Sequence, residues 1–135
     1  MLQTRELLDS LATKAPLNNE ILATTIDTLA TCEEAVTACA AGMVTGQDGA
    51  SMALAVALDL DCADSVLATR RILTRATGPN GALLAAQLEA CLIACQRSHE
   101  ECSRHSAHHE HCRLCADATR QAADACRQAL AALRA

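Results

Sequence analysis

The sequence predicts an all-α protein: an up-down-up-down four-helix bundle that follows a short N-terminal helix, within a single domain over residues 1–135. Hydrophobic residues make up 51% of the chain, and most of them are alanine or leucine, which form helices readily. Only five glycines and two prolines are present to interrupt helices. The chain has no Phe, Tyr or Trp, so its core must consist of small and medium side chains that let helices approach closely.

Two helices are expected in the first third of the chain. A short helix over residues 2–14 is interrupted by the segment "KAPLNNE". Asn18 or Asn19 can cap the next helix, because a short polar side chain accepts a hydrogen bond from a free backbone N–H, and Pro16 lies just outside it. We expect this long helix to cover residues 18–43.

Three more helices complete the predicted bundle. The segment "TGQDGAS" is a turn in which Asp48 can cap a helix over residues 48–76, and "TGPNG" is a strong stop signal after that helix. A third long helix is expected over residues 80–105. A fourth is expected over residues 108–133, although neither Gly nor Pro marks the break before it. Connections this short make consecutive helices antiparallel neighbours.

Charge and hydropathy exclude several classes of partner. The net charge of −5 speaks against binding to nucleic acid or to anionic membrane surfaces. The longest apolar stretch, "MALAVAL", is too short to span a bilayer, and the early charges of Arg5, Glu6 and Asp9 are unlike a signal peptide. We therefore expect a cytoplasmic protein. Its nine cysteines should then stay reduced, as metal ligands or as small core residues.

The cysteines recur at helical spacing. Residues separated by four, seven or eleven positions lie on one face of an α-helix, and in an amphipathic bundle helix this is the buried face. Within the expected helices such spacing relates Cys32 to Cys39, Cys91 to Cys95 and Cys102, and Cys115 to Cys126, while Cys112 precedes Cys115 by three and Cys62 stands alone. A buried thiol can simply fill space, but alanine would do so without the risk of oxidation. We therefore expect an interior lined with metal-binding thiols.

Histidines gather at the end of the bundle where the third helix leads into the fourth. His108 and His111 each precede a cysteine by four residues, which predicts that both face inward, and His105 follows Cys102 by three. We expect these three imidazoles to pass metal to the thiolates or to be ligands themselves. His109 is expected to be solvated. Met43, at the same end, can add a thioether ligand or fill a gap in the core.

The spacing of the thiols favours Cu(I) as the metal. Paired thiolates that face each other across a bundle suit a soft monovalent ion. A zinc site requires four ligands in a compact constellation, and "CRLC" supplies only half of such a motif. An iron–sulfur cluster meets the same objection.

Three segments resemble the bacterial copper storage protein family: "LDLDCADSVLATRRILTR", "AQLEACLIACQRSHEECSRH" and "HHEHCRLCADATRQAADAC". The resemblance covers roughly residues 30 to 133. It implies a four-helix bundle that holds many Cu(I) ions through inward cysteines, with copper entering at the histidine-containing end. Family members without a signal peptide are cytosolic and resemble tetramers, so the resemblance implies a homo-oligomer here.

The chain departs from this family at seven positions where relatives usually have further cysteines. These positions are occupied by Val36, Met43, Ala55, Val66, Ser98, Thr119 and Ala122. Counted along the helices at about 1.5 Å per residue, the remaining thiols fall into two groups. Cys39, Cys102, Cys112 and Cys115 lie near the histidine end with Met43, whereas Cys32, Cys62, Cys91 and Cys95 lie in mid-bundle. We therefore predict two small copper sites, with Cys126 deeper, alone and structural.

Three functions stay open at this point. The first is a cytosolic Cu(I)-binding protein that stores, buffers or transfers copper, with a copper chaperone as a possible partner. The second is a copper-dependent enzyme on the same bundle, an oxidase that uses oxygen on a small-molecule substrate, because thiols have been lost while the histidine end is kept. The third is a helical interaction protein without a role in copper binding.

Overall fold

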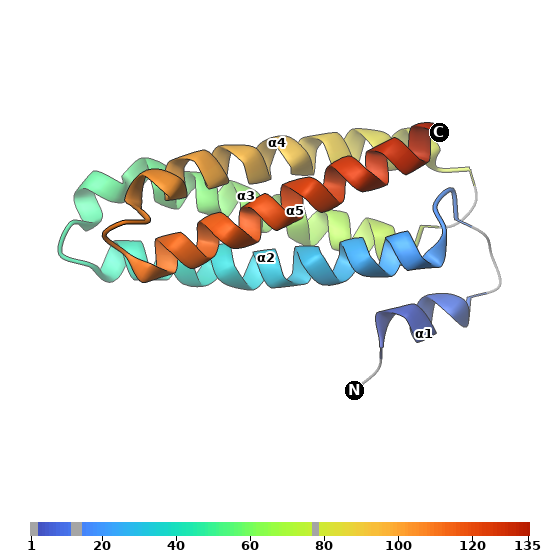
Figure 1. Ribbon diagram of the computed structural model, residues 1–135, viewed down its shortest axis with the longest axis horizontal. Coiled ribbons are helices and arrows are strands. Elements are labelled where there is room, and N and C mark those ends of the chain that lie inside the picture. The colour runs from blue at the N-terminus through green and yellow to red at the C-terminus, as the bar shows by residue number, and fades with distance from the viewer. Residues whose placement is uncertain (1–2, 12–14, 77–78) are drawn as a thin grey trace.

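The computed structural model describes residues 3–11, 15–76 and 79–135, and all regular structure in these residues is helical. The helices are α1 (Thr4–Asp9), α2 (Asn19–Thr45), the 3₁₀ helix η1 (Gly49–Met52), α3 (Ala53–Thr74), α4 (Gly81–His105) and α5 (Glu110–Arg134). Figure 1 shows α2 to α5 side by side, with the chain reversing direction at each connection. The predicted fold class, an up-down-up-down four-helix bundle after a short first helix, is confirmed.

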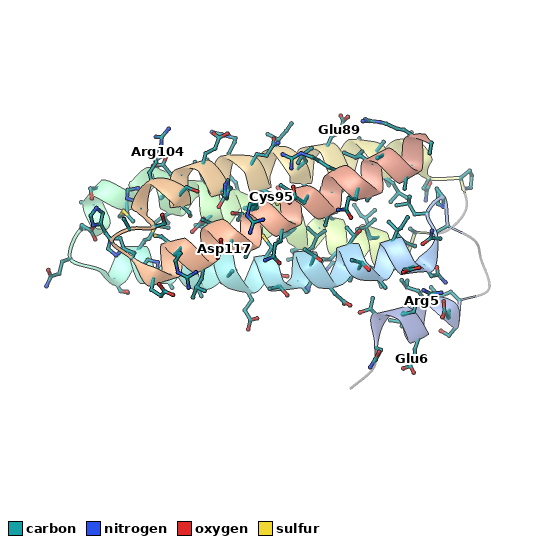
Figure 2. All side chains as sticks on the ribbon, viewed as in Figure 1. Arg5, Glu6, Glu89, Cys95, Arg104 and Asp117 are labelled. Atoms are coloured by element: carbon teal, nitrogen blue, oxygen red, sulfur yellow. The ribbon has the colours of Figure 1, made fainter. Side chains whose placement is uncertain are left out.

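The four long helices form a closed ring of neighbours. α2 packs against α3 and α5, and α4 packs against the same two helices. Each helix therefore turns one stripe of side chains toward a shared interior. Figure 2 shows Cys95 within the bundle, whereas Arg104 and Glu89 extend away from it.

Local chemistry explains where α2 begins and why the next helix is divided. Asn18 caps α2, because its side-chain oxygen accepts a hydrogen bond of 2.9 Å from the Ile21 backbone N–H. The expected cap by Asp48 is wrong, since its side chain makes no capping hydrogen bond. The expected helix over 48–76 instead starts as η1 and becomes α-helical at Ala53.

The end of α1 and the start of α5 also differ from the prediction. α1 ends at Asp9, and residues 12–14 of the expected first helix lie outside the described residues. α5 begins at Glu110 rather than at residue 108, because His109 has an extended backbone (φ −137°, ψ 119°) and serves as the N-cap residue. This later start changes which histidines face the interior.

The interior has two chemically different halves. Toward the amino end of α2 the core consists of leucines and alanines, with Leu22, Leu29, Leu73, Leu84 and Leu88 almost fully buried. Toward the opposite end it consists largely of cysteines, and all nine have no exposed area. The prediction that the thiols line the inside of the bundle is confirmed.

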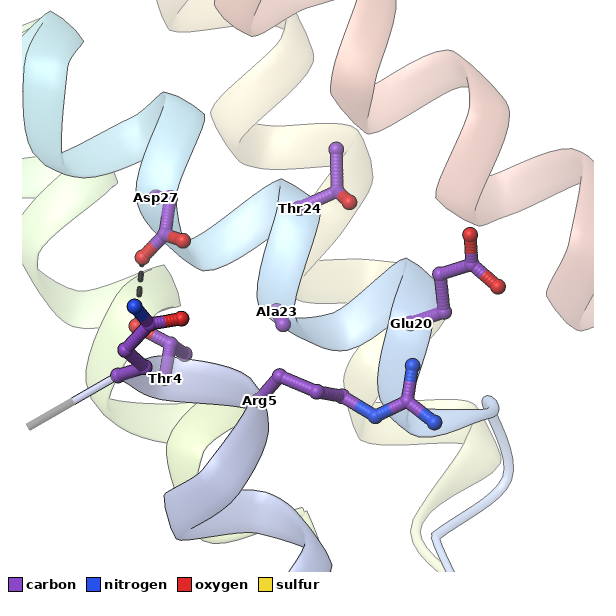
Figure 3. Close-up of a pocket in the computed structure, with 7 residues that line it drawn as sticks. Thr4, Arg5, Glu20, Ala23, Thr24 and Asp27 are labelled. Carbon is purple, nitrogen blue, oxygen red and sulfur yellow. Dashed lines mark hydrogen bonds between the residues drawn. The ribbon is translucent and has the colours of Figure 1, made fainter.

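α1 lies outside the bundle against α2 (Figure 1). The Thr4 hydroxyl donates a hydrogen bond of 2.6 Å to Asp27, and the Asn19 amide donates one of 2.9 Å to Asp9. Leu8 is buried in this contact. Figure 3 shows the pocket that Thr4, Asp27 and their neighbours line between the two helices. None of the helices in the described residues has the length and apolar character that a membrane span requires.

Candidate metal centre

One group of donors draws a single residue from each bundle helix. Cys39 of α2, Asp59 of α3, Cys102 of α4 and Cys115 of α5 place ligand atoms within 4.8 Å of one another. The Cys102 and Cys115 sulfurs lie 3.3 Å apart. Because these residues come from four helices, the bundle fold itself assembles the group.

A second group shares Cys39 with the first. The Cys39 sulfur lies 3.3 Å from Nδ1 of His111 and 3.8 Å from the Cys112 sulfur. Nδ1 of His111 also lies 3.5 Å from the Cys112 sulfur. We call the union of the two groups the mouth cluster, which consists of Cys39, Asp59, Cys102, His111, Cys112 and Cys115.

Asp59 is a candidate ligand that the sequence reasoning missed. Its side chain is fully buried, and Oδ1 accepts a hydrogen bond of 2.7 Å from the Ser98 hydroxyl and lies 3.2 Å from the Cys102 sulfur. Within the described chain, its Oδ2 is buried without a hydrogen-bond partner. Burial, followed by the negative charge of Cys102, raises the pKa of Asp59 to about 7. A signal was available, because Asp59 precedes Cys62 by three residues and so shares the inward stripe of α3.

A third group contains sulfur alone. The Cys62 sulfur lies 3.9 Å from that of Cys32 and 3.7 Å from that of Cys95, so α2, α3 and α4 each contribute one thiol. Cys91 interacts with Cys95 and with Cys126 of α5 closely enough for their hydrogen bonds to shift its pKa. The prediction that Cys126 lies alone is therefore wrong. We call Cys32, Cys62, Cys91, Cys95 and Cys126 the mid-bundle cluster.

Hydrogen bonds between thiols favour the ionisation of three sulfurs, one in the mouth cluster and two in the mid-bundle cluster. An ionised sulfur is stabilised when neighbouring S–H groups donate to it, while the donors themselves become harder to ionise. The largest such donors are Cys62 for Cys32, Cys126 for Cys91 and Cys115 for Cys102, and the lowered pKa values are about 5 for Cys32, about 4 for Cys91 and about 3 for Cys102. The same contacts raise the pKa of Cys62, Cys95, Cys115 and Cys126. Each cluster thus offers a readily formed thiolate among protonated neighbours, a suitable first site for a soft cation.

The structure differs from the prediction in which histidines face the interior and which are exposed. His111 faces the thiols as expected, but His108 is exposed in the turn before α5, so its predicted place on the inward stripe is wrong. His109, expected to be solvated, contacts Asp48 at 3.1 Å and stacks on His111 with ring centroids 5.3 Å apart. Among the described residues His105 lies outside the three donor groups, with Nε2 3.5 Å from Glu101.

A glycine makes room for the inward histidine. The His111 ring lies against Gly42 of α2, where an added Cβ would come within 3.1 Å of the ring carbon Cδ2. A side chain at this position would push the imidazole away from Cys39. Gly42 therefore helps to position His111.

The seven positions at which the family resemblance led us to expect further cysteines all face the interior. Val36, Met43, Ala55, Val66, Ser98, Thr119 and Ala122 are each at most 1% exposed. The stripe of thiols on α4 is interrupted between Cys95 and Cys102. Ser98 lies in this interval and donates a hydrogen bond to Asp59 of α3. The two clusters are thus separated by residues other than cysteine, and a ligand role for Met43 stays a prediction.

The chain is similar to known copper storage proteins in sequence and in structure. Residues 18–131 match the profile of a family described as copper storage protein. A copper storage protein from Streptomyces lividans loaded with 10 copper equivalents has 35% sequence identity and a TM-score of 0.91, over 95% of this chain and 98% of that chain. A cytosolic copper storage protein from the same organism, with five coppers, has 38% identity and a TM-score of 0.81, over 83% and 93% of the two chains. A histidine-to-alanine variant of the Streptomyces protein has 37% identity and a TM-score of 0.84, over 87% and 98%. No curated protein matches the chain.

Proposed function

The chain belongs to the copper storage protein family, and on that premise we propose that it stores, buffers or transfers Cu(I) in the cytosol through inward-facing thiolates. The observation that carries this proposal is the convergence of sulfur atoms from separate helices, with neighbouring sulfurs 3.3 to 3.9 Å apart inside a buried core. Thiolates are the ligands that select Cu(I) over harder ions. Storage requires no further chemistry.

Binding exchanges protons for copper. Cys32, Cys91 and Cys102 ionise most easily and provide the first ligands. Their neighbours, whose pKa values are raised, lose protons only when a bound cation compensates the charge. Copper binding therefore releases protons and weakens at low pH. Burial then protects bound Cu(I) from oxygen and from competing thiols.

The mouth cluster is the proposed site of uptake. His111 is half-buried and contacts Cys39, so an imidazole stands between solvent and the buried thiols. His105 lies at the same end of the bundle and is partly exposed, where it can hold copper transiently. Together with Met43 these residues form the histidine-rich end proposed to receive and return copper.

Cellular location and assembly are proposed by analogy with the family. The five-copper structure is that of a cytosolic copper storage protein, which supports a cytosolic location for this chain. Assembly into a homo-oligomer, a tetramer by resemblance, stays a prediction, as does exchange of copper with a chaperone. Size-exclusion chromatography with light scattering tests the assembly directly.

The test of the proposed function is an anaerobic titration of the reduced protein with Cu(I) in the presence of a Cu(I) chelator. We expect several equivalents to be withheld from the chelator and released slowly. A parallel titration with Zn²⁺ is the control. We expect Zn²⁺ to bind at most at the four-donor group of Cys39, Asp59, Cys102 and Cys115, because the sulfur-only mid-bundle cluster suits a soft monovalent ion. Failure to compete with the chelator for any copper would contradict storage.

The same titration addresses the enzymatic alternative. A copper oxidase on this bundle predicts one to three bound equivalents and copper-dependent oxygen uptake with a small-molecule substrate. Storage predicts more copper and no oxygen uptake. An oxygen electrode measurement on the loaded protein separates the two.

A further inference from the structure

The four-donor group of Cys39, Asp59, Cys102 and Cys115 has a property that the spacing of the cysteines did not predict. Each bundle helix contributes one of these residues, and all four ligand atoms lie within 4.8 Å of one another. None of the four residues has any exposed area. The folded protein therefore contains the compact set of four ligands that a closed zinc site requires.

The separations of the donor atoms fit a tetrahedral ion of the size of Zn²⁺. With Zn–S and Zn–O bonds of about 2.3 and 2.1 Å, two sulfur ligands lie about 3.8 Å apart, and a sulfur and an oxygen lie about 3.6 Å apart. In the protein the Cys102 and Cys115 sulfurs are 3.3 Å apart, and Oδ1 of Asp59 lies 3.2 Å from the first and 3.5 Å from the second. These atoms need to move outward only slightly to admit an ion between them.

Asp59 favours a divalent ion over Cu(I) in this group. In the part of the chain that the structure describes, its Oδ2 is buried without a hydrogen-bond partner, and a buried carboxylate oxygen in this state is costly. A cation bound to the carboxylate compensates for the missing partner. Oxygen is a hard donor that Zn²⁺ accepts beside thiolates, whereas Cu(I) prefers sulfur. Two positive charges also balance buried anionic ligands better than one does.

The other two donor groups among the described residues have three members each. The group within the mid-bundle cluster has three sulfurs and no oxygen, which suits Cu(I). The group around His111 shares Cys39 with the four-donor group, so it lacks a ligand whenever the four-donor group is filled. One Zn²⁺ per chain is therefore the expected stoichiometry.

We propose that the copper-free protein binds one Zn²⁺ in the four-donor group, in a closed tetrahedral site with one ligand from each bundle helix. Binding exchanges the remaining protons of the three thiols for the ion, whose waters return to solvent, and no electron is transferred. The ion joins all four helices, so it stabilises the folded protein when copper is absent. This site does not rest on copper storage, because its ligand and its geometry are different.

The test is an anaerobic titration of the reduced, copper-free protein with Co²⁺ and then with Zn²⁺. Co²⁺ adopts the same geometry and, unlike Zn²⁺, absorbs visible light when thiolates bind it. We expect one equivalent of Co²⁺ to give the spectrum of a tetrahedral thiolate site, and one equivalent of Zn²⁺ to remove that spectrum, because Zn²⁺ binds such sites more tightly. Zn²⁺ should also raise the temperature of thermal unfolding.

Four variants locate the ion. Asp59→Asn keeps the shape of the side chain but removes its charge, and we expect the affinity for Zn²⁺ to fall at least about tenfold. Cys102→Ser removes a second ligand and should abolish the thiolate spectrum of Co²⁺. Asp61→Asn, exposed on the same helix as Asp59, and Cys62→Ala, in the mid-bundle cluster, are the controls and should bind Co²⁺ and Zn²⁺ as the unmodified protein does.

Two results would overturn the proposal. One is a folded, unmodified protein that binds neither Co²⁺ nor Zn²⁺. The other is a Co²⁺ spectrum that survives in both Asp59→Asn and Cys102→Ser, or that disappears in Cys62→Ala, because the ion would then lie elsewhere. Titration of the same preparation with Cu(I) against a chelator tests the proposed function separately, so either conclusion can fail without the other.

Discussion

The mouth cluster and the mid-bundle cluster are built on the same four helices but differ in donors and in access. The mouth cluster combines sulfur with the His111 imidazole and the Asp59 carboxylate, and it adjoins a surface groove. The mid-bundle cluster contains thiols alone, and all five of them are fully buried. One scaffold can thus provide both a site suited to exchange and a site suited to retention.

The chemical difference predicts a gradient of affinity along the bundle. Thiolates bind Cu(I) more favourably than carboxylate oxygen does, so a sulfur-only cluster should hold copper more tightly than a mixed one. Mixed donors near the surface should exchange copper faster. Copper entering at the mouth is therefore expected to collect in mid-bundle.

The largest expected effect comes from removing either cluster. Replacement of Cys32, Cys62 and Cys95 by alanine should abolish the most tightly held copper, because these sulfurs form the only sulfur-only group of three among the described residues. The matched replacement of Cys39, Cys102 and Cys115 should remove the weaker, faster-exchanging copper instead. Anaerobic titration against chelators of graded affinity measures both populations. Equal losses of both populations in the two variants would show that the bundle holds a single site.

The second effect concerns Asp59 and pH. Because burial raises its pKa to about 7, the folded protein without copper binds this proton more tightly than the unfolded chain does, and Asp59 favours folding at low pH. That contribution is lost as pH rises from about 4, the pKa in the unfolded chain, through about 7, the pKa in the folded protein. The difference between these two pKa values corresponds to at most about 4 kcal/mol of folding free energy.

Replacement of Asp59 by Asn removes this titration while keeping the shape of the side chain. Relative to Asp59→Asn, the unmodified protein without copper should become less stable as pH rises over this interval. Chemical denaturation followed by circular dichroism measures the difference at each pH. Asp61→Asn is the control, because Asp61 is exposed on the same helix. A difference between the Asp59 variant and unmodified protein that stays constant with pH would contradict the prediction.

Replacing Ser98 by cysteine should join the two clusters. Ser98 lies on α4 between Cys95 and Cys102, is fully buried and contacts Asp59. A thiol in its place would make the donors of α4 continuous. We therefore expect Ser98→Cys to load in a single phase with higher capacity, whereas the unmodified protein loads in two. Ser103→Cys, on the exposed face, is the control for an added thiol. Two unchanged phases would show that the separation does not depend on Ser98.

The smallest expected effect comes from Gly42→Ala. The added methyl group displaces His111, so loading at the mouth should slow a few-fold, while retention in mid-bundle should not change. Because alanine is the better helix former by about 1 kcal/mol, the stability of the copper-free protein should not fall. Stopped-flow loading and thermal unfolding together measure both effects. Slower loading accompanied by loss of stability would point to general distortion rather than to the histidine.

Helical periodicity predicted the bundle and the burial of every thiol, because a repeat near 3.6 residues determines which side chains share a face. The inward place of His111 followed from the same rule. The error at His108 arose from the start of the last helix: α5 begins at Glu110, and a residue before that start is not on the helical stripe at all. His109 then occupies the N-cap, where it meets Asp48.

Contacts between helices were harder to predict than which face of each helix is buried. Cys91 lies 14 residues before the end of α4 and Cys126 lies 16 residues after the start of α5, which places them almost level at about 1.5 Å per residue. The sequence reasoning compared these positions too coarsely. Asp59 was missed for another reason, since carboxylates are usually assigned to the surface. Only the thiols and Ser98 around it make its burial tolerable.

Both clusters take donors from all four bundle helices. Each copper ion that bridges two of them acts as a reversible cross-link, and a protein that binds ligand only when folded opens less often as it fills. We therefore expect cellular proteases to degrade empty copies before loaded ones. The lifetime of each molecule in the cell would then follow the amount of cargo it carries.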